Sequence, residues 1–109
     1  MNLEINVTEG EKQTLVSLSG EVDVYTASKL KETLNPLAEQ DGQSLIVDLS
    51  NIDYIDSTGL GIFIGTLKIT EKSNSELKLT GLNERVKRLF EITGLNEVID
   101  INTEKREEA

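Results

Sequence analysis

The sequence predicts a single α/β domain, in which a mixed β-sheet carries its helices mainly on one face. Two strand-like segments flank a turn at residues 9–12, which is typical of a β-hairpin. Later strand-like segments alternate with segments of helical periodicity, which is typical of β-α-β units with parallel strands. The length of 109 residues fits one domain with one hydrophobic core, covering residues 1–109.

The first elements are the hairpin and a helix. Apolar and polar residues alternate over residues 3–7, and an apolar segment at residues 15–18 follows the turn. A helix is expected to begin near Thr26, because apolar residues then recur roughly on one helical face: Ala27, Leu30, Leu34 and Leu37. Pro36 is expected to kink or interrupt this helix.

The middle of the chain predicts an inner strand, a long helix and another strand. Residues 44–49 contain a central apolar run, which suits a strand that is covered on at least one face. A helix is then expected to extend to near Lys72, and residues 76–80 alternate as a strand does. If strands are added in one direction, right-handed crossovers put successive helices on one face of the sheet.

The C-terminal part predicts a short helix and a last edge element. Asn83 can cap this helix, and Gly94 is a typical C-terminal stop. Residues 98–101 are expected to form an edge strand or a short helix. Residues 102–109 are mostly charged and are expected to be a frayed tail.

Composition excludes several classes of function. The net charge of −9 argues against nucleic acid as a partner and favours a partner with a basic surface. The chain has no cysteine and no histidine, so disulfides, thiolate or histidine metal sites and Ser-His-Asp catalysis are excluded. No signal-like start and no apolar run of about 20 residues is present, so we expect a cytoplasmic protein without membrane contact.

The segment DSTGLG at residues 56–61 joins a predicted strand to a predicted helix, and it has a structural interpretation. Ser57 would be the helix N-cap, where its hydroxyl contributes about 1 kcal/mol. Gly59 would allow a tight turn, and Gly61 and Gly65 would allow close packing. A catalytic serine is poorly supported, because no histidine base exists and Lys68 lies about three helical turns away.

Two other site classes are weaker. Gly59, Gly61 and Gly65 are spaced G-x-G-x-x-x-G, which departs from the dinucleotide-binding pattern, so nucleotide binding is a minor alternative. Asp53 and Asp56 are two carboxylates without further ligands, which make a poor metal site. Asp56 would also complement the dipole of the following helix. Neither a metal nor a cofactor is expected.

The helix after this segment suggests a partner-binding face. Its sheet-facing side is expected to hold four apolar residues: Leu60, Phe63, Ile64 and Leu67. Ile62, Thr66 and Ile69 would lie nearly opposite, beside Gly61 and Gly65. This stripe would be a docking face if it is exposed, or it would be buried by a neighbouring helix. The sequence leaves both arrangements open.

If the stripe is exposed, Ser57 would lie at the rim of a partner-binding surface. A kinase could then use Ser57 as a substrate, so that the chain would need no base of its own. Phosphate adds about −1.5 to −2 charges at pH 7. A helix N-terminus accommodates an anion, so phosphorylation would change binding without refolding the domain.

Three separate blocks carry a resemblance to a known family. They are GEVDVYTA at residues 20–27, YIDSTGLGIFIGTLK at residues 54–68 and RVKRLFEITGL at residues 85–95. In this order they resemble the anti-sigma factor antagonists, the single-domain members of the STAS family. The similarity is greatest to the general stress-response (RsbV-type) branch.

This resemblance implies a partner switch and not an enzyme. The unphosphorylated antagonist binds an anti-sigma factor that is also a serine kinase, and thereby frees the sigma factor. The kinase phosphorylates the motif serine, Ser57 here, and a PP2C-type phosphatase restores the active form. Thr58 is a competing acceptor. The resemblance also places Asp23 and Asp56 near Ser57 on the kinase-facing surface, with Thr58 and Gly59 of the same motif.

Three alternatives remain at this stage. The chain could be a sporulation-type antagonist, with the same chemistry but a different kinase and sigma factor. It could be a small nucleotide-binding protein built on the glycine-containing segment. It could also be a scaffold domain of a larger sensing complex.

Overall fold

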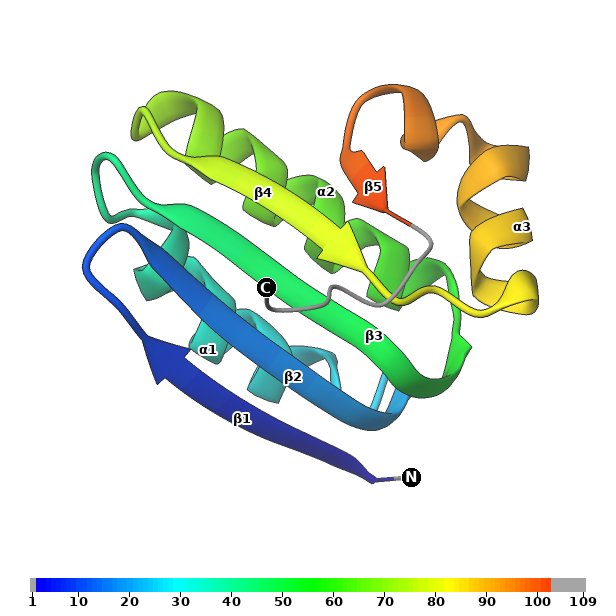
Figure 1. Ribbon diagram of the computed structural model, residues 1–109. Helices are drawn as coiled ribbons and strands as arrows, with labels where there is room; N and C mark the ends of the chain where they lie inside the picture. The colour runs from blue at the N-terminus through cyan, green and yellow to red at the C-terminus, as the bar shows by residue number, and fades with distance from the viewer. Residues whose placement is uncertain (1, 103–109) are drawn as a thin grey trace.

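The computed structural model describes residues 2–102, which form a five-stranded sheet with strand order β1-β2-β3-β4-β5 (Figure 1). β1 and β2 are antiparallel, and the other neighbouring strands are parallel. The strands are β1 (Leu3–Glu9), β2 (Gln13–Val22), β3 (Ser44–Ile55), β4 (Glu76–Thr80) and β5 (Asp100–Asn102). The helices are α1 (Ala27–Ala38), α2 (Ser57–Lys72), α3 (Glu84–Thr93) and the 3-10 helix η1 (Leu95–Glu97). The predicted mixed sheet and its hairpin are confirmed.

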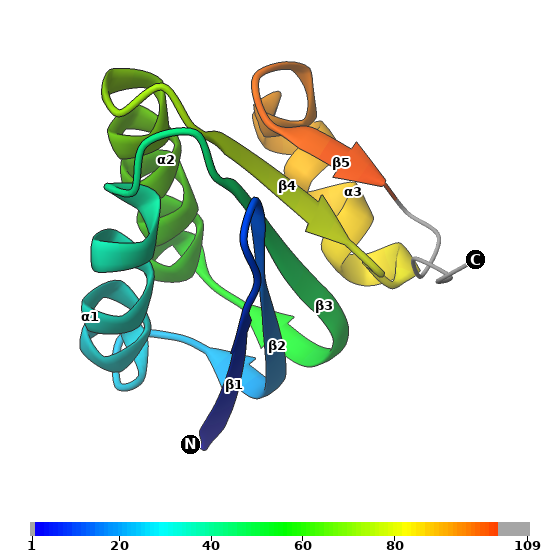
Figure 2. The same ribbon diagram turned by 60° about the vertical axis from the view of Figure 1, so that its left-hand side comes forward.

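The helices lie mainly on one face of the sheet, as predicted. α1 and α2 cover one face together, whereas α3 stands apart beside β4 and β5 (Figures 1 and 2). The strands are added in a single direction across the sheet. Right-handed crossovers then place α1 and α2 on the same face.

The hydrophobic core lies between the sheet and these two helices. Val16, Val47 and Leu79 occupy neighbouring positions on β2, β3 and β4, and all three are fully buried. The helices add fully buried side chains, which include Leu30, Leu34 and Phe63. The rings of Phe63 and Phe90 lie 6.2 Å apart, so α3 joins the same core.

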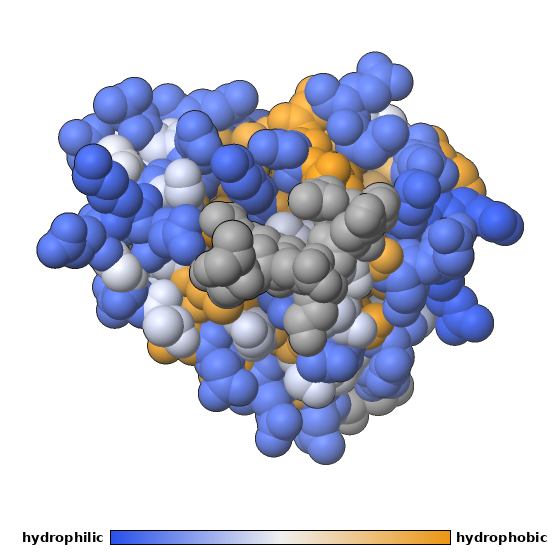
Figure 3. Space-filling view, viewed as in Figure 1, coloured by the Kyte–Doolittle hydropathy of each residue, from blue (hydrophilic) through white to orange (hydrophobic). Residues whose placement is uncertain are grey.

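The opposite face of the sheet is more polar. Because side chains alternate along a strand, Ser17 and Asp48 point away from the core that holds Val16 and Val47. Figure 3 shows that the visible part of this face is mostly hydrophilic, with small groups of hydrophobic residues. One face of the sheet therefore carries the core, as is common where an antiparallel edge is present.

β2 and β3 are longer than the sequence predicted. β3 continues beyond residues 44–49 to Ile55, and β2 continues to Val22. Their pairing shifts twice, so bulges interrupt the alternation that a regular strand would show. Gly20, inside β2, has φ of 119°, and a Cβ there would overlap with the carbonyl oxygen of Asn2. A strand with such irregularities is difficult to recognise from its pattern.

Pro36 does not interrupt α1, contrary to the prediction. The helix continues to Ala38, and the N–H of Glu39 donates to the carbonyl of Asn35 at 3.2 Å. Pro36 lies in the last turn and is exposed, so only its own missing N–H affects the helix.

The C-terminal elements agree with the sequence. The side chain of Asn83 caps α3 by accepting a hydrogen bond from Val86 N at 2.9 Å, and Gly94 ends the helix with φ of 77°. Of the two options left open, the edge strand is observed, as β5 after η1. Asn102 closes β5 and so does not belong to a frayed tail. The rest of that predicted tail, residues 103–109, lies outside the described residues.

Candidate partner-binding site

The first turn of α2 is organised by Asp56. Its carboxylate accepts a hydrogen bond from Gly59 N at 3.0 Å, and its main-chain N–H donates to Val22 O at 3.1 Å. Asp56 is therefore the N-cap, and it ties the start of α2 to the end of β2. The interpretation of Ser57 as the cap is wrong, because Ser57 is already the first helical residue.

We expect Asp56→Ala to destabilise the fold by about 1 kcal/mol, because this substitution removes the cap of α2. Asp53→Ala is a matched control, since Asp53 is an exposed carboxylate near the same end of the helix. The control should change the free energy of unfolding by less than about 0.5 kcal/mol. Urea unfolding measures both. Equal effects of the two substitutions would contradict the capping role.

The side chain of Ser57 is accessible from solvent. Within residues 2–102 its hydroxyl has no hydrogen-bond partner. The first N–H groups of α2 lie beside it, where an anion is favoured. Thr58 is exposed as well. Accessibility alone therefore does not choose between the two hydroxyls.

Gly59 has a packing role, and not the turn-forming role predicted from the sequence. It lies inside the helical first turn and is buried. A Cβ at this position would lie 2.7 Å from Cγ1 of Val22 and 2.9 Å from Cγ2 of Ile55. Only glycine allows α2 to approach the ends of β2 and β3 this closely. Because Gly59 is buried, the side of α2 on which it lies is not available to a partner.

Gly61 and Gly65 lie on the exposed face of α2. A Cβ at either position would meet no atom of the described chain within 4 Å. The prediction that they allow close packing within the fold is therefore wrong. Together with Ser57 and Thr58 they form what we call the small-residue face of α2, and the exposed Lys68 follows it along the helix. This face lets another molecule approach the helix backbone.

The predicted stripe of Ile62, Thr66 and Ile69 is not a free surface. Thr66 is 0% exposed, and its hydroxyl donates to Ile62 O at 2.9 Å. Ile62 and Ile69 are half-buried and pack against the core. Of the two arrangements left open, burial within the fold is correct for Thr66. Only the edges of the two isoleucines border the small-residue face.

The reason is that the buried side of α2 is rotated from the predicted one. Leu60 and Phe63 are buried as expected, whereas Ile64 and Leu67 are only half-buried. Thr70 takes an inside position, and its hydroxyl donates to the carbonyl of Leu67 at 2.7 Å. Threonine can be buried in a helix because its hydroxyl bonds a carbonyl of the preceding turn.

Asp23 lies at the same end of the sheet as Ser57, but it is not on the surface as predicted. It is 4% exposed, and its Oδ1 accepts hydrogen bonds from Tyr25 N at 2.9 Å and Thr26 N at 3.1 Å. In return, Asp23 N donates to Thr26 Oγ1 at 3.0 Å. The carboxylate is therefore used to hold the loop at residues 23–26, in the manner of an Asx-turn.

This loop exposes side chains that the sequence analysis did not single out. Tyr25 is 80% exposed and Val24 is 60% exposed. Tyr54, which is 45% exposed, pairs with Glu21 just before the loop. The sequence does contain a signal for these exposed side chains. Val24 and Tyr25 are apolar residues between Asp23 and the start of a helix, and neither strand nor helix periodicity explains them.

The charge of this region is uneven. Residues 20–26 and 50–61 contain four carboxylates and neither lysine nor arginine: Glu21, Asp23, Asp53 and Asp56. Lys68 and Lys72 are exposed at the other end of α2. Glu71 is exposed beside these lysines, so that end of α2 carries charges of both signs, whereas the segments at the Ser57 end carry only carboxylates.

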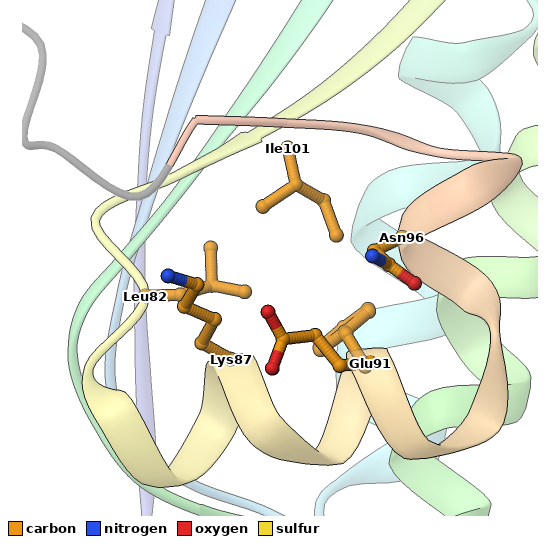
Figure 4. Close-up of a pocket in the computed structure, with 6 residues that line it drawn as sticks. Leu82, Lys87, Glu91, Asn96 and Ile101 are labelled. Carbon is orange, nitrogen blue, oxygen red and sulfur yellow. The ribbon is translucent and has the colours of Figure 1, made fainter.

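A small cavity lies between α3, η1 and β5, apart from the segments around Ser57 (Figure 4). Its volume is about 170 Å³, whereas ligand pockets usually have about 300–1,000 Å³. It is lined by Leu82, Lys87, Phe90, Glu91, Asn96 and Ile101. The glycines of the nucleotide alternative, moreover, lie within α2 and not in a loop before it. A larger open hollow of about 580 Å³ is lined in part by Tyr25, Thr26 and Lys29, so cavity size does not decide the question. The placement of the glycines inside the helix does not support nucleotide binding.

Two further properties concern residues 2–102 only. In this part of the chain, no cluster of three or more potential metal-binding side chains is present. The same residues include no helix with the length and apolar character that a membrane span requires.

The fold and the site together define a small α/β domain with an exposed serine in the first turn of a long helix. Comparison with known proteins shows its family. The STAS domain profile matches residues 2–109, so the chain belongs to the STAS-domain family. This confirms the family inferred from the three sequence blocks. It also confirms the fold class, since known members share this architecture.

Individual relatives show to which kind of STAS-domain protein this chain is similar. The chain is 49% identical over 102 residues to the anti-sigma-B factor antagonist of Bacillus subtilis, which covers 94% of this chain and 93% of that protein. The crystal structure of an anti-sigma factor antagonist from Mycobacterium paratuberculosis matches with a TM-score of 0.83 at 24% identity, covering 93% of this chain and 86% of that one. The antagonist SpoIIAA in its unphosphorylated form matches with a TM-score of 0.76 at 17% identity, covering 90% and 87%. These two structures show the fold alone.

Proposed function

We propose that this protein is an anti-sigma factor antagonist of the sigma-B type, whose unphosphorylated form binds an anti-sigma factor and so releases the sigma factor. The observation that carries the proposal is Ser57. Its hydroxyl is exposed, has no hydrogen-bond partner in the described part of the chain, and lies at the start of α2 beside the small-residue face. The chain is 49% identical to an anti-sigma-B factor antagonist. That identity favours the stress-response branch over the sporulation-type alternative.

The small-residue face supports a docking role. Glycine in a helix interior is less favourable than alanine by about 1 kcal/mol, and α2 contains Gly61 and Gly65 at exposed positions. No packing within residues 2–102 requires them. A partner that approaches the backbone of α2 would explain these glycines, because a missing side chain leaves it room.

The switch follows from the position of Ser57. The proposed partner is itself a serine kinase, which transfers the γ-phosphoryl group of ATP to Ser57 Oγ and takes up the hydroxyl proton. The phosphate brings about −1.5 to −2 charges and a hydration shell to the centre of the contact. The free N–H groups at the start of α2 tolerate this anion, so the domain stays folded while the complex dissociates.

Two further parts complete the proposal. A PP2C-type phosphatase hydrolyses the phosphoserine and returns the chain to its binding form. The chain itself contributes no catalytic group and acts as a binding protein and substrate. Its place of action is the cytoplasm, where a sigma factor acts.

A competition assay tests this function. A complex of sigma factor with the cognate anti-sigma-B-type factor is mixed with increasing amounts of the purified chain. We expect the unphosphorylated chain to release the sigma factor, detected by the fluorescence anisotropy of labelled sigma factor. Absence of release at a large excess of chain would contradict the proposal.

A further inference from the structure

We propose that the loop at residues 23–26 is the apolar anchor with which this chain holds its anti-sigma factor. This inference rests on the proposed function and specifies the surface that the partner must recognise. Val24 and Tyr25 are the side chains that enter the partner, and Asp23 is a positioning residue that keeps the loop in its binding form.

The exposure of these side chains is the first reason. Among the large hydrophobic residues that the described chain leaves exposed, Tyr25 has the highest exposed fraction, 80%, and the adjacent Val24 is 60% exposed. A single exposed apolar residue is common on protein surfaces, but two adjacent ones on one loop offer a larger apolar area to a partner. Tyrosine is also enriched among the residues that dominate binding energies.

The rigidity of the loop is the second reason. Asp23 Oδ1 accepts hydrogen bonds from the N–H groups of Tyr25 and Thr26. The hydroxyl of Thr26 lies 2.9 Å from Glu21 O, where it can donate back to β2. Val24 and Tyr25 are thus presented by a backbone that is already ordered. Binding through such a loop loses little conformational entropy.

The loop is also continuous with the Ser57 surface. Val22, the residue before the loop begins, accepts the main-chain hydrogen bond of Asp56 and packs against Gly59. Tyr54 approaches the same end through its pairing with Glu21. A partner that covers Ser57 therefore also meets the loop, so one interface includes the switch and the anchor.

The charges define the chemistry of the partner. Glu21, Asp53 and Asp56 belong to the segments at this end, and residues 20–26 and 50–61 hold no lysine or arginine. Lys29 lines a hollow together with Tyr25, and its Nζ donates a hydrogen bond to Leu3 O at 2.7 Å. A complementary surface on the anti-sigma factor is a shallow apolar pocket with a rim of arginine or lysine. Such a cation can stack on the ring of Tyr25 while it pairs with the carboxylates.

The test compares Tyr25→Ala and Val24→Ser with the unaltered chain, by calorimetric titration against the cognate anti-sigma-B-type factor in ADP. We expect Tyr25→Ala to raise Kd at least tenfold, Val24→Ser to raise it several-fold, and Tyr25→Phe to retain most of the affinity. Ile92→Ala is the matched control, because Ile92 is a large hydrophobic residue that is 74% exposed on a different element, α3. It should change Kd less than twofold. All variants should keep the urea midpoint, because the side chains are exposed.

The outcomes distinguish failure of the proposed function from failure of the proposed anchor. If the unaltered chain does not bind, the proposed function fails, and this inference fails with it. If the unaltered chain binds and both loop variants bind equally well, only the anchor is wrong. The alternative is that the loop contacts a second copy of this chain, and sedimentation velocity without the partner tests it. If Tyr25→Ala abolishes a self-association while partner binding is unchanged, the loop contacts a second copy of the chain and the inference is overturned.

Discussion

Phosphorylation of Ser57 is expected to weaken binding of the anti-sigma factor by several kcal/mol, which is at least about a hundredfold in Kd. The hydroxyl is exposed in the free chain and, in the proposed complex, would be covered by the partner. A phosphate at this position must give up much of its hydration when the partner covers it, and this desolvation opposes binding. Ser57→Asp should weaken binding in the same direction. Calorimetric titration of the purified phosphorylated form measures the effect.

Matched variants separate the acceptor from its neighbour. Ser57→Ala should bind with unchanged affinity and should remain bound when ATP is supplied. Thr58→Ala should still be phosphorylated and released. A loss of less than about 1 kcal/mol on phosphorylation would place Ser57 outside the contact. The urea midpoint of the phosphorylated chain should match that of the unmodified chain, because the switch acts on binding and not on folding.

The three glycines of α2 should respond to alanine in opposite directions. Gly59→Ala is expected to destabilise the fold by about 1–3 kcal/mol, since its Cβ would overlap with Val22 and Ile55. Gly61→Ala and Gly65→Ala should stabilise it by up to about 1 kcal/mol each, because their Cβ atoms meet open space. Urea unfolding of the three variants provides this comparison within one helix.

Binding assays give the second half of this prediction. If the partner docks on the small-residue face, Gly61→Ala and Gly65→Ala should weaken binding although they stabilise the free chain. The added methyl groups would occupy the space that the partner needs. Stabilised variants with unchanged affinity would show that the partner binds elsewhere, and would remove the support that these glycines give to the docking role.

The fold was predictable because hydrophobic periodicity determines most of it. The hairpin, the alternation of strands and helices, and the Asn83 cap with the Gly94 stop all follow local rules. β2 and β3 were predicted too short because bulges break the period of two. Such bulges depend on pairing between strands distant in sequence, which no local pattern reveals.

The site was predictable in its location but not in the roles of its side chains. Asp56 and Ser57 are adjacent and both are good cap residues, so the sequence alone does not fix which one begins the helix. Asp23 and Thr66 are polar residues that the fold buries, because nearby main-chain groups satisfy them. A polar residue with a local hydrogen-bond partner does not have to be at the surface. Tyr25 is the opposite case, because it is a large side chain that stays exposed although residue type alone does not indicate this.

The most direct test of the switch is a single reaction of the purified chain with its cognate anti-sigma factor, first with ADP and then with ATP. Complex formation is followed by size-exclusion chromatography, and the phosphate is located by fragmentation mass spectrometry. We predict a stable complex in ADP, dissociation in ATP, and one phosphate per chain on Ser57. Phosphate on Thr58, or dissociation of Ser57→Ala in ATP, would contradict Ser57 as the switch.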